Sequence, residues 1–575
     1  MVVLAAINAK YIHSNLAVYS LKAYAEKESS DMFPEIRIAE YTINQPVEDI
    51  MGSLYEMNAQ VVAFSCYIWN IEYVCRIARE LKKVMPELQI WMGGPEVSYH
   101  AEEFLQQHSF VDLVMLGEGE VVFRRLVRGD ARETISGIAY REQGSVRIQP
   151  PDELVNLNEL PFVYQNMEDF EHKIVYYESS RGCPFRCSYC LSSIDKQVRF
   201  RNLDLVKQEL QFFLNHRVPQ VKFIDRTFNC NPAHAVAVWE YILNHDNGVT
   251  NFHFEISADL ITEEELELLK QMRKGLIQLE IGLQTTNSDT VQAIERHMDI
   301  GRIKENMLRI HSFENIHQHL DLIAGLPYED LGRFRQSFDE AYSMEAEQLQ
   351  LGFLKVLKGS GMEELAEEYG LKYTDVPPYE VLSTNWLSYS DILELKRIEE
   401  MLEVYHNSGQ FRYSLGYIME FQNSAFDFFS QLGEYYKRMG YEGLQWKRLD
   451  RYNILRDFLL KSGMWKPQQK RTIQNEGEIV EWNPEKMDAL LLHDLYLREN
   501  LKKRPDWARN YEEQKKEIAG FFKKSGRTGR MMHLEPWKDN TKPGYVLYDY
   551  EDKSEFDHSA RAEFITEEEF REVLL

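Results

Sequence analysis

Short apolar runs alternate with amphipathic stretches over the first 120 residues of the chain. The stretches between the runs, such as Glu72 to Met85 and Ala101 to His108, have the 3.6-residue spacing of helices. The expected strands are Val2 to Ile7, Ile36 to Ile43, Val61 to Ile68, Leu88 to Met92 and Leu113 to Leu116. Such alternation predicts a parallel sheet with helices on both faces.

A second series of strands and helices follows after residue 170. Its strands are expected at Ile174 to Glu178, Val221 to Asp225, Phe252 to Ile256, Ile277 to Gly282, Leu320 to Ala324 and Leu349 to Val356. A hairpin near Gly137 to Ile148 and a linker at Leu157 to Pro161 separate the two series. The chain therefore contains two successive α/β domains.

Beyond about residue 360 the pattern is mainly helical. Aromatic-rich amphipathic segments at Asp391 to Tyr405 and Phe426 to Met439 predict a third, helical region. Residues 498–530 carry eleven Lys or Arg against five Asp or Glu, which favours a solvated helix face over an RNA contact. The acidic end, Glu551 to Leu575, reads as a surface appendage with one helix capped at Thr566.

Composition limits the class of protein. At 575 residues the chain is too long for one hydrophobic core, so two or three domains are expected. Its formal net charge of -26 disfavours bulk attraction to nucleic acid or anionic lipid, although a local basic patch is compatible with it. Outside one cluster of three, Cys66, Cys75 and Cys230 do not resemble a disulfide framework, which favours a reducing compartment.

The N-terminal run Met1 to Asn8 has no preceding basic residue and no cleavage-site pattern, so it reads as a strand rather than a signal peptide. No apolar stretch reaches membrane-spanning length. The expectation is a soluble cytoplasmic protein without a membrane partner.

Three cysteines, Cys183, Cys187 and Cys190, lie close together on one short segment. Zinc would need a fourth Cys or His at short spacing, and the nearest downstream candidates, His216 and Cys230, fall in separate expected elements. A 4Fe-4S cluster normally takes four thiolates. Three thiolates would therefore leave one iron open to a small chelating molecule.

The run Arg181 to Cys190 resembles the cysteine motif of the radical S-adenosylmethionine (SAM) superfamily. The resemblance implies that Cys183, Cys187 and Cys190 hold a 4Fe-4S cluster, which binds SAM through its open iron and cleaves it to a 5'-deoxyadenosyl radical. It also implies an open (β/α)6 barrel with the cluster loop after its first strand. Tyr189 matches the aromatic residue that members place against the SAM adenine.

Further motifs follow the cysteines in the superfamily's order. The run Glu280 to Thr285 resembles the fourth-strand motif that meets SAM, and Gly325-Leu326-Pro327 resembles the fifth-strand motif beside adenine. Where a Gly-Gly-Glu segment often contacts the SAM amino group, this chain has Asp225 and Arg226, for which an exposed ion pair stays an alternative. The implied SAM residues are Tyr189, Asp225, Glu255, Glu280, Gln284, Thr285, Gly325, Leu326 and Pro327.

Ligands of parallel sheets bind at the carboxyl ends of the strands, where glycines let the backbone approach closely. On fold alone, a nucleotide site or an interaction domain would be equally compatible with the first domain. The order of a Rossmann-like domain, hairpin, linker and cysteine motif resembles the cobalamin-binding radical SAM subgroup, over about 360 residues. The implied cobalamin residues are Ser65, Tyr67, Trp69, Asn70, Gly93, Gly94, Pro95, Glu96, Gly117, Glu118, Gly119 and Glu120.

The Asp-x-His-x-x-Gly motif, whose His ligates cobalt from below in several cobalamin enzymes, does not occur in the chain. Many members of the subgroup also lack this motif. His13 lies in Tyr11-Ile12-His13-Ser14-Asn15 and reads as a helix-start residue with Ser14 or Asn15 as the cap. The lower ligand of cobalt is therefore not expected to be a protein histidine.

The resemblance implies an α/β chain with a Rossmann-like doubly wound cobalamin-binding domain, a partial (β/α)6 radical SAM barrel and a mainly α C-terminal region. The expected segments are 1–135 for cobalamin binding, 136–169 for hairpin and linker, 170–360 for the radical SAM core, 361–550 for the helical domain and 551–575 for the acidic tail. The strand ends of the first domain would have to face those of the second.

The activity implied is methylation of an unactivated carbon, in which one SAM methylates cobalamin and another yields the radical. Three alternatives stay open: a rearrangement or cyclisation without methyl transfer, RNA modification through residues 498–530, and a cobalamin or redox sensor. The residues specify neither the substrate nor the electron donor, for which ferredoxin or flavodoxin are candidates.

Overall fold

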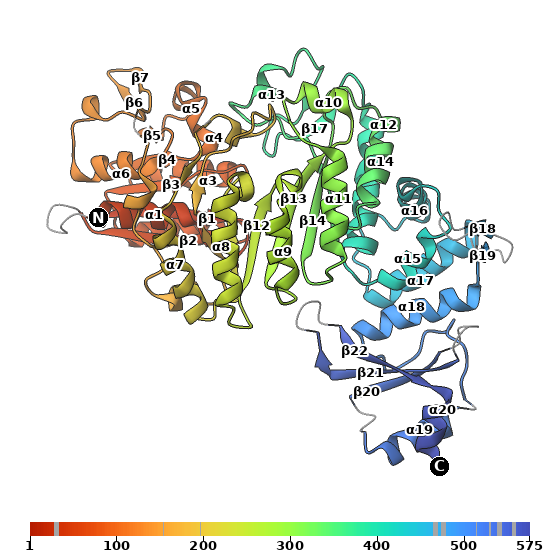
Figure 1. Ribbon diagram of the computed structural model, residues 1–575. Helices are drawn as coiled ribbons and strands as arrows, with labels where there is room; N and C mark the ends of the chain where they lie inside the picture. The colour runs from red at the N-terminus through yellow and green to blue at the C-terminus, as the bar shows by residue number, and fades with distance from the viewer. Residues whose placement is uncertain are drawn as a thin grey trace. The chain divides into compact units, whose positions relative to one another are not determined.

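The computed structural model describes residues 1–27, 34–152, 154–195, 197–463, 470–472, 479–512, 514–527, 531–537, 543–554 and 559–575. The chain divides into two compact units (Figure 1). The first comprises Met1–Phe334 and Gly352–Tyr389, and the second comprises Arg335–Leu351 and Ser390–Leu575. Among the described residues, none of the helices combines the length and the apolar character needed to cross a membrane.

The first unit opens with a seven-stranded sheet in the order β2-β1-β3-β4-β5-β6-β7. The strands are β1 (Val2–Asn8), β2 (Ile36–Thr42), β3 (Val61–Ser65), β4 (Gln89–Gly93), β5 (Leu113–Met115), β6 (Ile138–Glu142) and β7 (Ser145–Gln149). Strands β1 to β5 are parallel, and the β6–β7 hairpin continues the sheet in antiparallel fashion. The expected parallel sheet and hairpin are therefore confirmed.

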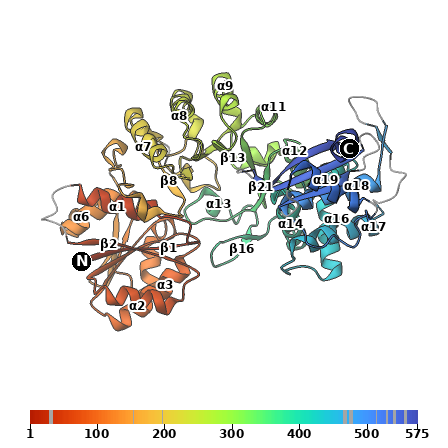
Figure 2. The same ribbon diagram turned by 90° about the horizontal axis from the view of Figure 1, so that it is seen from below.

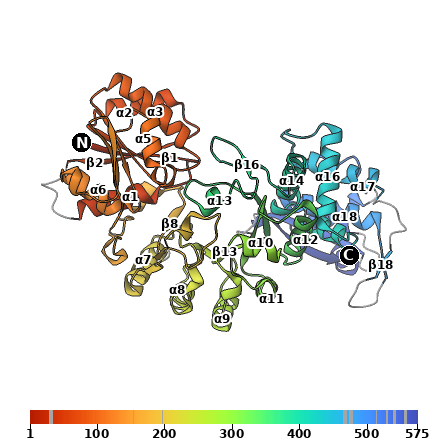
Figure 3. The same ribbon diagram turned by 90° about the horizontal axis from the view of Figure 1, so that it is seen from above.

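Helices cover both faces of this sheet, as Figures 2 and 3 show. One face carries α1 (Leu16–Glu26) and α6 (Gly119–Arg128), and the other carries α2 (Val47–Glu56), α3 (Ile71–Val84), α4 (Pro95–Ser98) and α5 (Ala101–Gln107). Successive side chains of a strand point to opposite faces. Val3 and Ala5 of β1 accordingly pack on the α2–α3 side, while Leu4 packs on the α1–α6 side.

A six-stranded sheet follows in the order β15-β14-β13-β12-β11-β8. Its strands are β8 (Val175–Tyr177), β11 (Gln220–Phe223), β12 (Asn251–Ile256), β13 (Ile277–Gln284), β14 (His317–Ala324) and β15 (Gln348–Phe353). Helices α7 (Leu203–Asn215), α8 (Pro232–Asn244), α9 (Glu263–Gln271) and α11 (Ile300–His311) lie in a row along one face (Figure 3). Strands from β8 to β14 are parallel and neighbour one another in chain order, which is the arrangement of an open (β/α) barrel.

Short elements complete the first unit. The two-stranded ribbon of β9 (Ser180–Arg181) and β10 (Arg199–Phe200) brackets the cysteine segment. Further short elements include α10 (Ser288–Ala293), α13 (Gly361–Glu364), β16 (Lys372–Tyr373) and β17 (Val381–Ser383). Helix α12 (Leu331–Tyr342) extends from the first unit into the second.

The second unit is helical with a small antiparallel sheet. Its helices are α14 (Tyr389–Leu402), which continues as a π-helical turn at Glu403–Asn407, α15 (Arg412–Met419), α16 (Ala425–Met439), α17 (Arg448–Lys461), α18 (Pro484–Arg498), α19 (Lys515–Ser525) and α20 (Glu567–Leu574). The sheet consists of β20 (Met532–Trp537), β21 (Gly544–Lys553) and β22 (Ala560–Thr566), and a separate ribbon pairs β18 (Lys470–Thr472) with β19 (Ile479–Glu481).

The final segment is not a surface appendage, so that expectation is wrong. Strand β22 pairs with β21, and Phe570 of α20 is buried against Phe521 and Tyr545. The acidic end contains few apolar residues, and these residues become buried only because the segment forms a sheet with residues earlier in the chain. Thr566 does cap the last helix, since its hydroxyl accepts a bond from the Glu569 backbone N–H.

The basic stretch 498–530 contributes partly to the same core, since Phe521 of α19 is buried. Arg504 lies over the Tyr511 ring and is bonded to Glu535. Four lysines of α19 are exposed, as expected for a solvated helix face: Lys515, Lys516, Lys523 and Lys524. Residues 513 and 528–530 of this stretch lie outside the described residues.

Candidate functional site

A cavity of about 930 Å³ lies where the strand ends of the two sheets meet. This volume falls in the upper part of the range found for small-molecule sites. Within the first unit, we call the part built on the seven-stranded sheet the first domain and the part built on the six-stranded sheet the second domain. From the first domain the lining of the cavity includes Asn8, Ser65, Tyr67, Trp69, Gly93, Gly94, Pro95, Gly117, Glu118, Gly119 and Glu120. From the second domain it includes Glu178, Ser180, Arg181, Gly182, Asp195 and Arg226. The strand ends of both domains thus line one cavity, as the sequence predicts.

Two aromatic side chains follow β3 into this cavity. The rings of Tyr67 and Trp69 are stacked, with centroids 4.4 Å apart and planes within 5° of parallel. Trp69 is 45% exposed although it is large and apolar. Ser65, which ends β3, accepts a 2.9 Å hydrogen bond from the Asn15 side chain. These contacts present a flat aromatic surface on the cavity wall.

Gly94 permits close approach of two strand ends. Its φ is +113°, and a Cβ atom there would lie 2.4 Å from the carbonyl oxygen of Cys66. No other residue fits without displacing backbone. A glycine at this position brings the end of β4 against the segment that leads to Trp69.

Two predicted cobalamin residues do not face the cavity. The buried amide of Asn70 donates bonds to the carbonyl oxygens of Ile7 (2.9 Å) and Ser65 (3.0 Å), so it fixes the loop after β3. Glu96 lines a second cavity of about 590 Å³ and accepts a 2.8 Å bond from the Tyr379 hydroxyl. Burial raises the pKa of Glu96. Its helical position in α4 turns its side chain away from that of Pro95.

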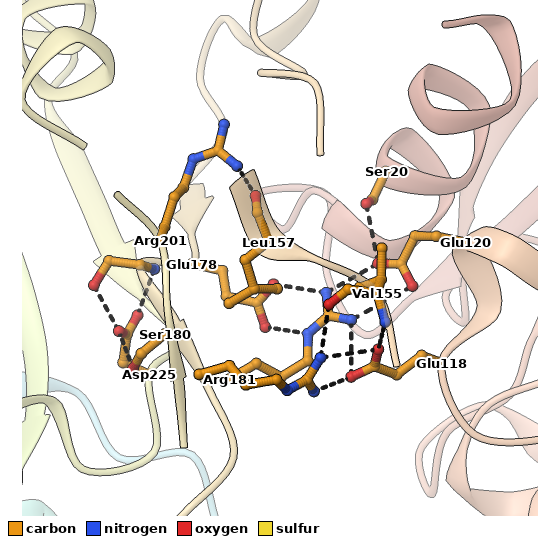
Figure 4. A network of polar contacts seen from close by, with 12 residues as sticks. Ser20, Glu118, Glu120, Val155, Leu157, Glu178, Ser180, Arg181, Arg201 and Asp225 are labelled. Atoms are coloured by element: carbon orange, nitrogen blue, oxygen red, sulfur yellow. Dashed lines mark hydrogen bonds and ion pairs between the residues drawn. The ribbon is translucent and has the colours of Figure 1, made fainter. Parts of the chain in front are cut away.

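Glu118 and Glu120 line the cavity, but both form ion pairs with the second domain (Figure 4). Arg181 Nη2 lies 2.9 Å from a Glu120 carboxylate oxygen. Burial alone would raise the pKa of Glu118, yet bonds from Arg199 and the charge of Arg181 hold that pKa below its usual range. The Glu118 carboxylate therefore remains charged.

The cysteine segment is closed at its base by Gly182. Its φ is +98°, and a Cβ would lie 2.2 Å from the Gln197 carbonyl oxygen, so only glycine lets the two ends of the loop approach. Cys183 and Cys187 are buried and Cys190 is half-buried. Across the described residues, no group of three or more His, Cys, Asp or Glu side chains is gathered around a position for a single metal ion.

Arg296 is a site residue that the sequence does not reveal. Its Nη1 lies 3.6 Å from Cys187 Sγ and donates a 3.2 Å bond to the Tyr189 hydroxyl. Burial opposes the guanidinium charge, but Tyr189 and Cys187 raise the pKa of Arg296 overall. Burial likewise raises the pKa of the Cys187 thiol, and Arg296 opposes that effect. No motif or periodicity marks Arg296, because it lies in the loop after α10.

Asp225 is fully buried beneath the entry to the cysteine segment. It accepts bonds from the Ser179 backbone N–H (3.0 Å), the Ser179 hydroxyl (2.7 Å) and the Ser180 hydroxyl (2.6 Å). Burial raises its pKa to about 6. Arg226 instead is exposed and lines the cavity, so the two residues do not form the exposed ion pair.

Charged side chains occupy one face of the barrel sheet. Glu280 of β13 lies 3.0 Å from Lys222 Nζ and 3.0 Å from His253 Nε2. Burial would raise the pKa of Glu280, but these two partners lower it to about 2. Glu255 lies opposite Glu280 in register, and burial raises its pKa to about 7. On β14, burial and these carboxylates raise the pKa of Asp321 to about 8.

Asp321, His253 and Lys222 were missed from the sequence, although alternation of polar residues along β11 to β14 is a usable signal. Strand β13 alternates buried Ile277, Leu279 and Ile281 with half-buried Gln278, Glu280 and Gly282. Apolar side chains on one face pack against the helices, so the polar set must share the opposite face.

The predicted residues at the strand ends shape the rim of the barrel. Gln284 ends β13 with a φ of +70°. The buried Thr285 hydroxyl donates a 2.7 Å bond to Glu329. Gly325 has a φ of +93°, and a Cβ there would lie 2.6 Å from a methyl carbon of Val381.

The two residues after Gly325 are held in the fold: Leu326 is buried, and the Pro327 carbonyl oxygen accepts a 2.7 Å bond from Thr290. Contact of any of these residues with SAM stays a prediction.

The predicted cap of α1 is confirmed, since the Asn15 side chain accepts a 3.4 Å bond from the Val18 backbone N–H. His13 Nδ1 lies 2.7 Å from the Tyr176 hydroxyl of β8, so this histidine joins the two domains. Burial lowers the pKa of His13.

Three family descriptions match the chain. Residues 2–127 match the B12 binding domain, residues 177–341 match the Radical SAM superfamily, and residues 367–557 match a family described as Protein of unknown function (DUF4080). The chain therefore combines a B12 binding domain with a radical SAM domain and a DUF4080 domain.

Two relatives of the chain are named as methyltransferases. The Cobalamin-dependent radical SAM methyltransferase TokK of Streptomyces tokunonensis is 27% identical over 388 residues, covering 61% of this chain and 55% of TokK. The 2-(S-pantetheinyl)-carbapenam-3-carboxylate methyltransferase of Streptantibioticus cattleyicolor is 25% identical, covering 72% of this chain and 67% of that protein. The chain thus spans about half the length of the first relative and about two thirds of the second.

Among solved structures, the radical S-adenosylmethionine methyltransferase TsrM from Kitasatospora setae, with cobalamin and a 4Fe-4S cluster bound, matches with a TM-score of 0.55. The identity is 16%, and the match covers 66% of this chain and 78% of TsrM. At this identity, the match shows that the chain and TsrM share a fold. Together these matches show that the chain is homologous to cobalamin-dependent radical SAM methyltransferases, and they confirm the expected fold class.

Proposed function

We propose that the chain is a cobalamin-dependent radical SAM enzyme that methylates an unactivated carbon of its substrate. The observation that carries this proposal is the single cavity that both the B12 binding domain and the base of the cysteine segment line. Radical transfer of a methyl group needs both cofactors within reach of one substrate. A shared cavity at the strand ends meets that requirement.

The residues of the site fit the cofactors. Three cysteines on one loop offer soft thiolate ligands, and Arg296 beside Cys187 favours the thiolate form. Gly94, where a Cβ would strike the Cys66 backbone, keeps the end of β4 against the segment that leads to Trp69. The exposed ring of Trp69 suits contact with a flat macrocycle. When bound, the iron–sulfur cluster, SAM and cobalamin would supply the radical and the methyl group.

The protein's own residues would bind, orient and shield these groups. Cys183, Cys187 and Cys190 would hold three irons and leave one for SAM. Glu255, Glu280 and Gln284 would orient SAM from the barrel strands, and Tyr67 and Trp69 would contact the cobalamin. Arg296 would hold Tyr189 through the 3.2 Å bond to its hydroxyl.

Three finer points extend the proposal. The polar barrel face, with Glu255 and Asp321, favours a substrate that can form hydrogen bonds over a wholly apolar one. Cys66, Cys75 and Cys230, the three cysteines outside the proposed cluster loop, form no disulfide bond, which suits the reducing cytoplasm. Reduction of the cluster would then depend on a low-potential donor such as ferredoxin or flavodoxin.

The experiment is anaerobic reconstitution with iron, sulfide and hydroxocobalamin, followed by incubation with dithionite and SAM. Formation of both 5'-deoxyadenosine and S-adenosylhomocysteine is expected. 5'-Deoxyadenosine alone would indicate radical chemistry without methyl transfer, and neither product would indicate a sensor. Cys187→Ala should abolish 5'-deoxyadenosine, whereas Cys75→Ala, a change in helix α3, should keep it.

A further inference from the structure

The densest ion-pair network of the described residues that line the cavity surrounds Arg181, two positions before Cys183 (Figure 4). Its guanidinium contacts three carboxylates. Nη2 lies 2.9 Å from Glu120 and 2.7 Å from Glu178, and Nη1 lies 3.3 Å from Glu118. The Arg181 side chain is 21% exposed and that of Glu120 is 7% exposed. Water therefore screens these pairs weakly.

Arg181 belongs to the base of the cysteine segment. Strand β9 pairs with β10 in antiparallel register, and Arg181 lies opposite Arg199. Arg199 also binds Glu118, and its Nη1 donates a 2.8 Å bond to the Val155 carbonyl oxygen. One arginine from each end of the cysteine segment thus binds the same glutamate of the first domain.

Glu118 and Glu120 belong to residues 117–120, a turn that follows β5 and includes the first two residues of α6. The same turn contributes Gly117 and Gly119 to the lining of the cavity proposed for cobalamin. Glu118 is fixed further by the Val155 backbone N–H, which donates a 2.8 Å bond. The turn at one cofactor site is therefore bonded directly to the loop of the other.

Breaking one member of a buried network leaves its partners charged and unpaired, which is costly. The turn and the base of the cysteine segment consequently keep their relative position or lose several bonds at once. We propose that Arg181 is a positioning residue that couples the two cofactor sites, so that loading the iron–sulfur cluster strengthens cobalamin binding. The coupling rests on the proposed function, because it requires that both cofactors bind. By linkage, cobalamin strengthens cluster retention by the same factor.

The test compares hydroxocobalamin affinity of the full chain with the cluster reconstituted and without it, by anaerobic titration. For the wild type we expect affinity to rise roughly fivefold or more when the cluster is present. In Arg181→Gln and in Glu120→Gln that ratio should fall to about one. Each ratio compares one variant with and without its cluster, so a change in the cobalamin affinity of the cluster-free variant does not enter it. The double variant should show no further loss, because both changes remove the same coupling.

Lys173→Gln is the matched control. Lys173 is bonded to Glu40 across the same two domains, with side chains 13% and 12% exposed, but away from the β9–β10 ribbon. It should keep the wild-type ratio. A ratio of one in the wild type, or a full ratio in folded Glu120→Gln protein, would overturn the proposal. Equal loss of the ratio in Lys173→Gln would also overturn it, because general docking would then explain the effect.

Arg181→Lys retains the charge but loses the planar fork. We expect partial recovery of the ratio in this variant. If circular dichroism shows that Arg181→Gln does not fold, Glu120→Gln alone tests the coupling, because it keeps the Arg181 bond to Glu178. Wild-type protein that binds neither cofactor would instead contradict the proposed function, and the two failures are therefore distinguishable.

Discussion

The guanidinium of Arg296 lies 3.6 Å from the sulfur of Cys187, which brings a buried positive charge against a proposed cluster ligand. The two residues are 109 positions apart in the chain. Charge and hydrogen bonds near cluster sulfur are main determinants of cluster potential. Arg296 is therefore expected to make the cluster easier to reduce.

Changing Arg296→Gln should lower the reduction potential of the cluster, because loss of the positive charge favours the oxidised form. The measurement is a redox titration of reconstituted protein followed by electron paramagnetic resonance. Arg309→Gln removes a partly exposed arginine that pairs with Glu263 and should leave the potential unchanged. Equal potentials for wild type and Arg296→Gln would contradict the assigned role.

Gly94→Ala should weaken hydroxocobalamin binding and destabilise the fold by about 1–3 kcal/mol, since its Cβ would meet the Cys66 carbonyl at a positive φ. Gly52→Ala is the control, because nothing lies within 4 Å of a Cβ at that position in helix α2. This second change should stabilise the protein by about 0.5–1 kcal/mol. Equilibrium dialysis measures hydroxocobalamin binding, and urea unfolding measures stability. Undiminished binding by Gly94→Ala would show that the close packing of Gly94 against Cys66 has no part in cobalamin binding.

Trp69→Ala should reduce cobalamin affinity about fivefold, because it removes the exposed ring from the cavity wall. Tyr55→Ala removes a comparably exposed ring of helix α2, away from this cavity, and should leave affinity unchanged. Fluorescence-monitored titration with hydroxocobalamin measures both. The aromatic wall has no part in binding if the two variants behave alike.

Glu280→Gln should reduce stability at pH 7 by about 1–3 kcal/mol, because it removes the carboxylate charge that Lys222 Nζ contacts at 3.0 Å. The folded pKa of Glu280, about 2, lies below its ordinary value of 4.5. The stabilisation is therefore fully present above pH 4.5 and is lost as the pH falls toward 2.

The free-energy difference between wild type and Glu280→Gln should accordingly shrink over this pH interval, as measured by urea unfolding of cofactor-free protein. Glu263→Gln, at an exposed ion pair with Arg309, should show a much smaller difference throughout. A difference that stays constant from pH 6 to pH 2.5 would show that the ion pair contributes nothing.

Much of the fold follows from local pattern. The strands expected from the sequence pattern lie within a few residues of the observed bounds of β12, β13 and β14. Strand β22 was missed because only Ile565 and Ala560 are buried in a run that is otherwise exposed. A strand stabilised mainly by pairing carries little hydrophobic signal of its own.

The sequence likewise predicts some residues of the candidate site correctly and others wrongly. Ser65, Trp69 and Gly94 line the cavity because a strand end and its following turn fix their direction locally. Asn70 and Glu96 follow in the same two turns but point elsewhere, one into the loop and one toward Tyr379. Sequence spacing locates a turn, whereas the direction of each side chain depends on what packs beside it.

The sequence by itself determined the three-cysteine loop, the two α/β domains and their order, because spacing and periodicity act over a few residues. Tertiary structure alone decided that Arg296 reaches Cys187, that Asp225 holds Ser179 and Ser180, and that Arg181 joins Glu118 and Glu120. Each of these contacts pairs groups tens of residues apart. Only the packed chain provides the burial that makes such polar pairs selective.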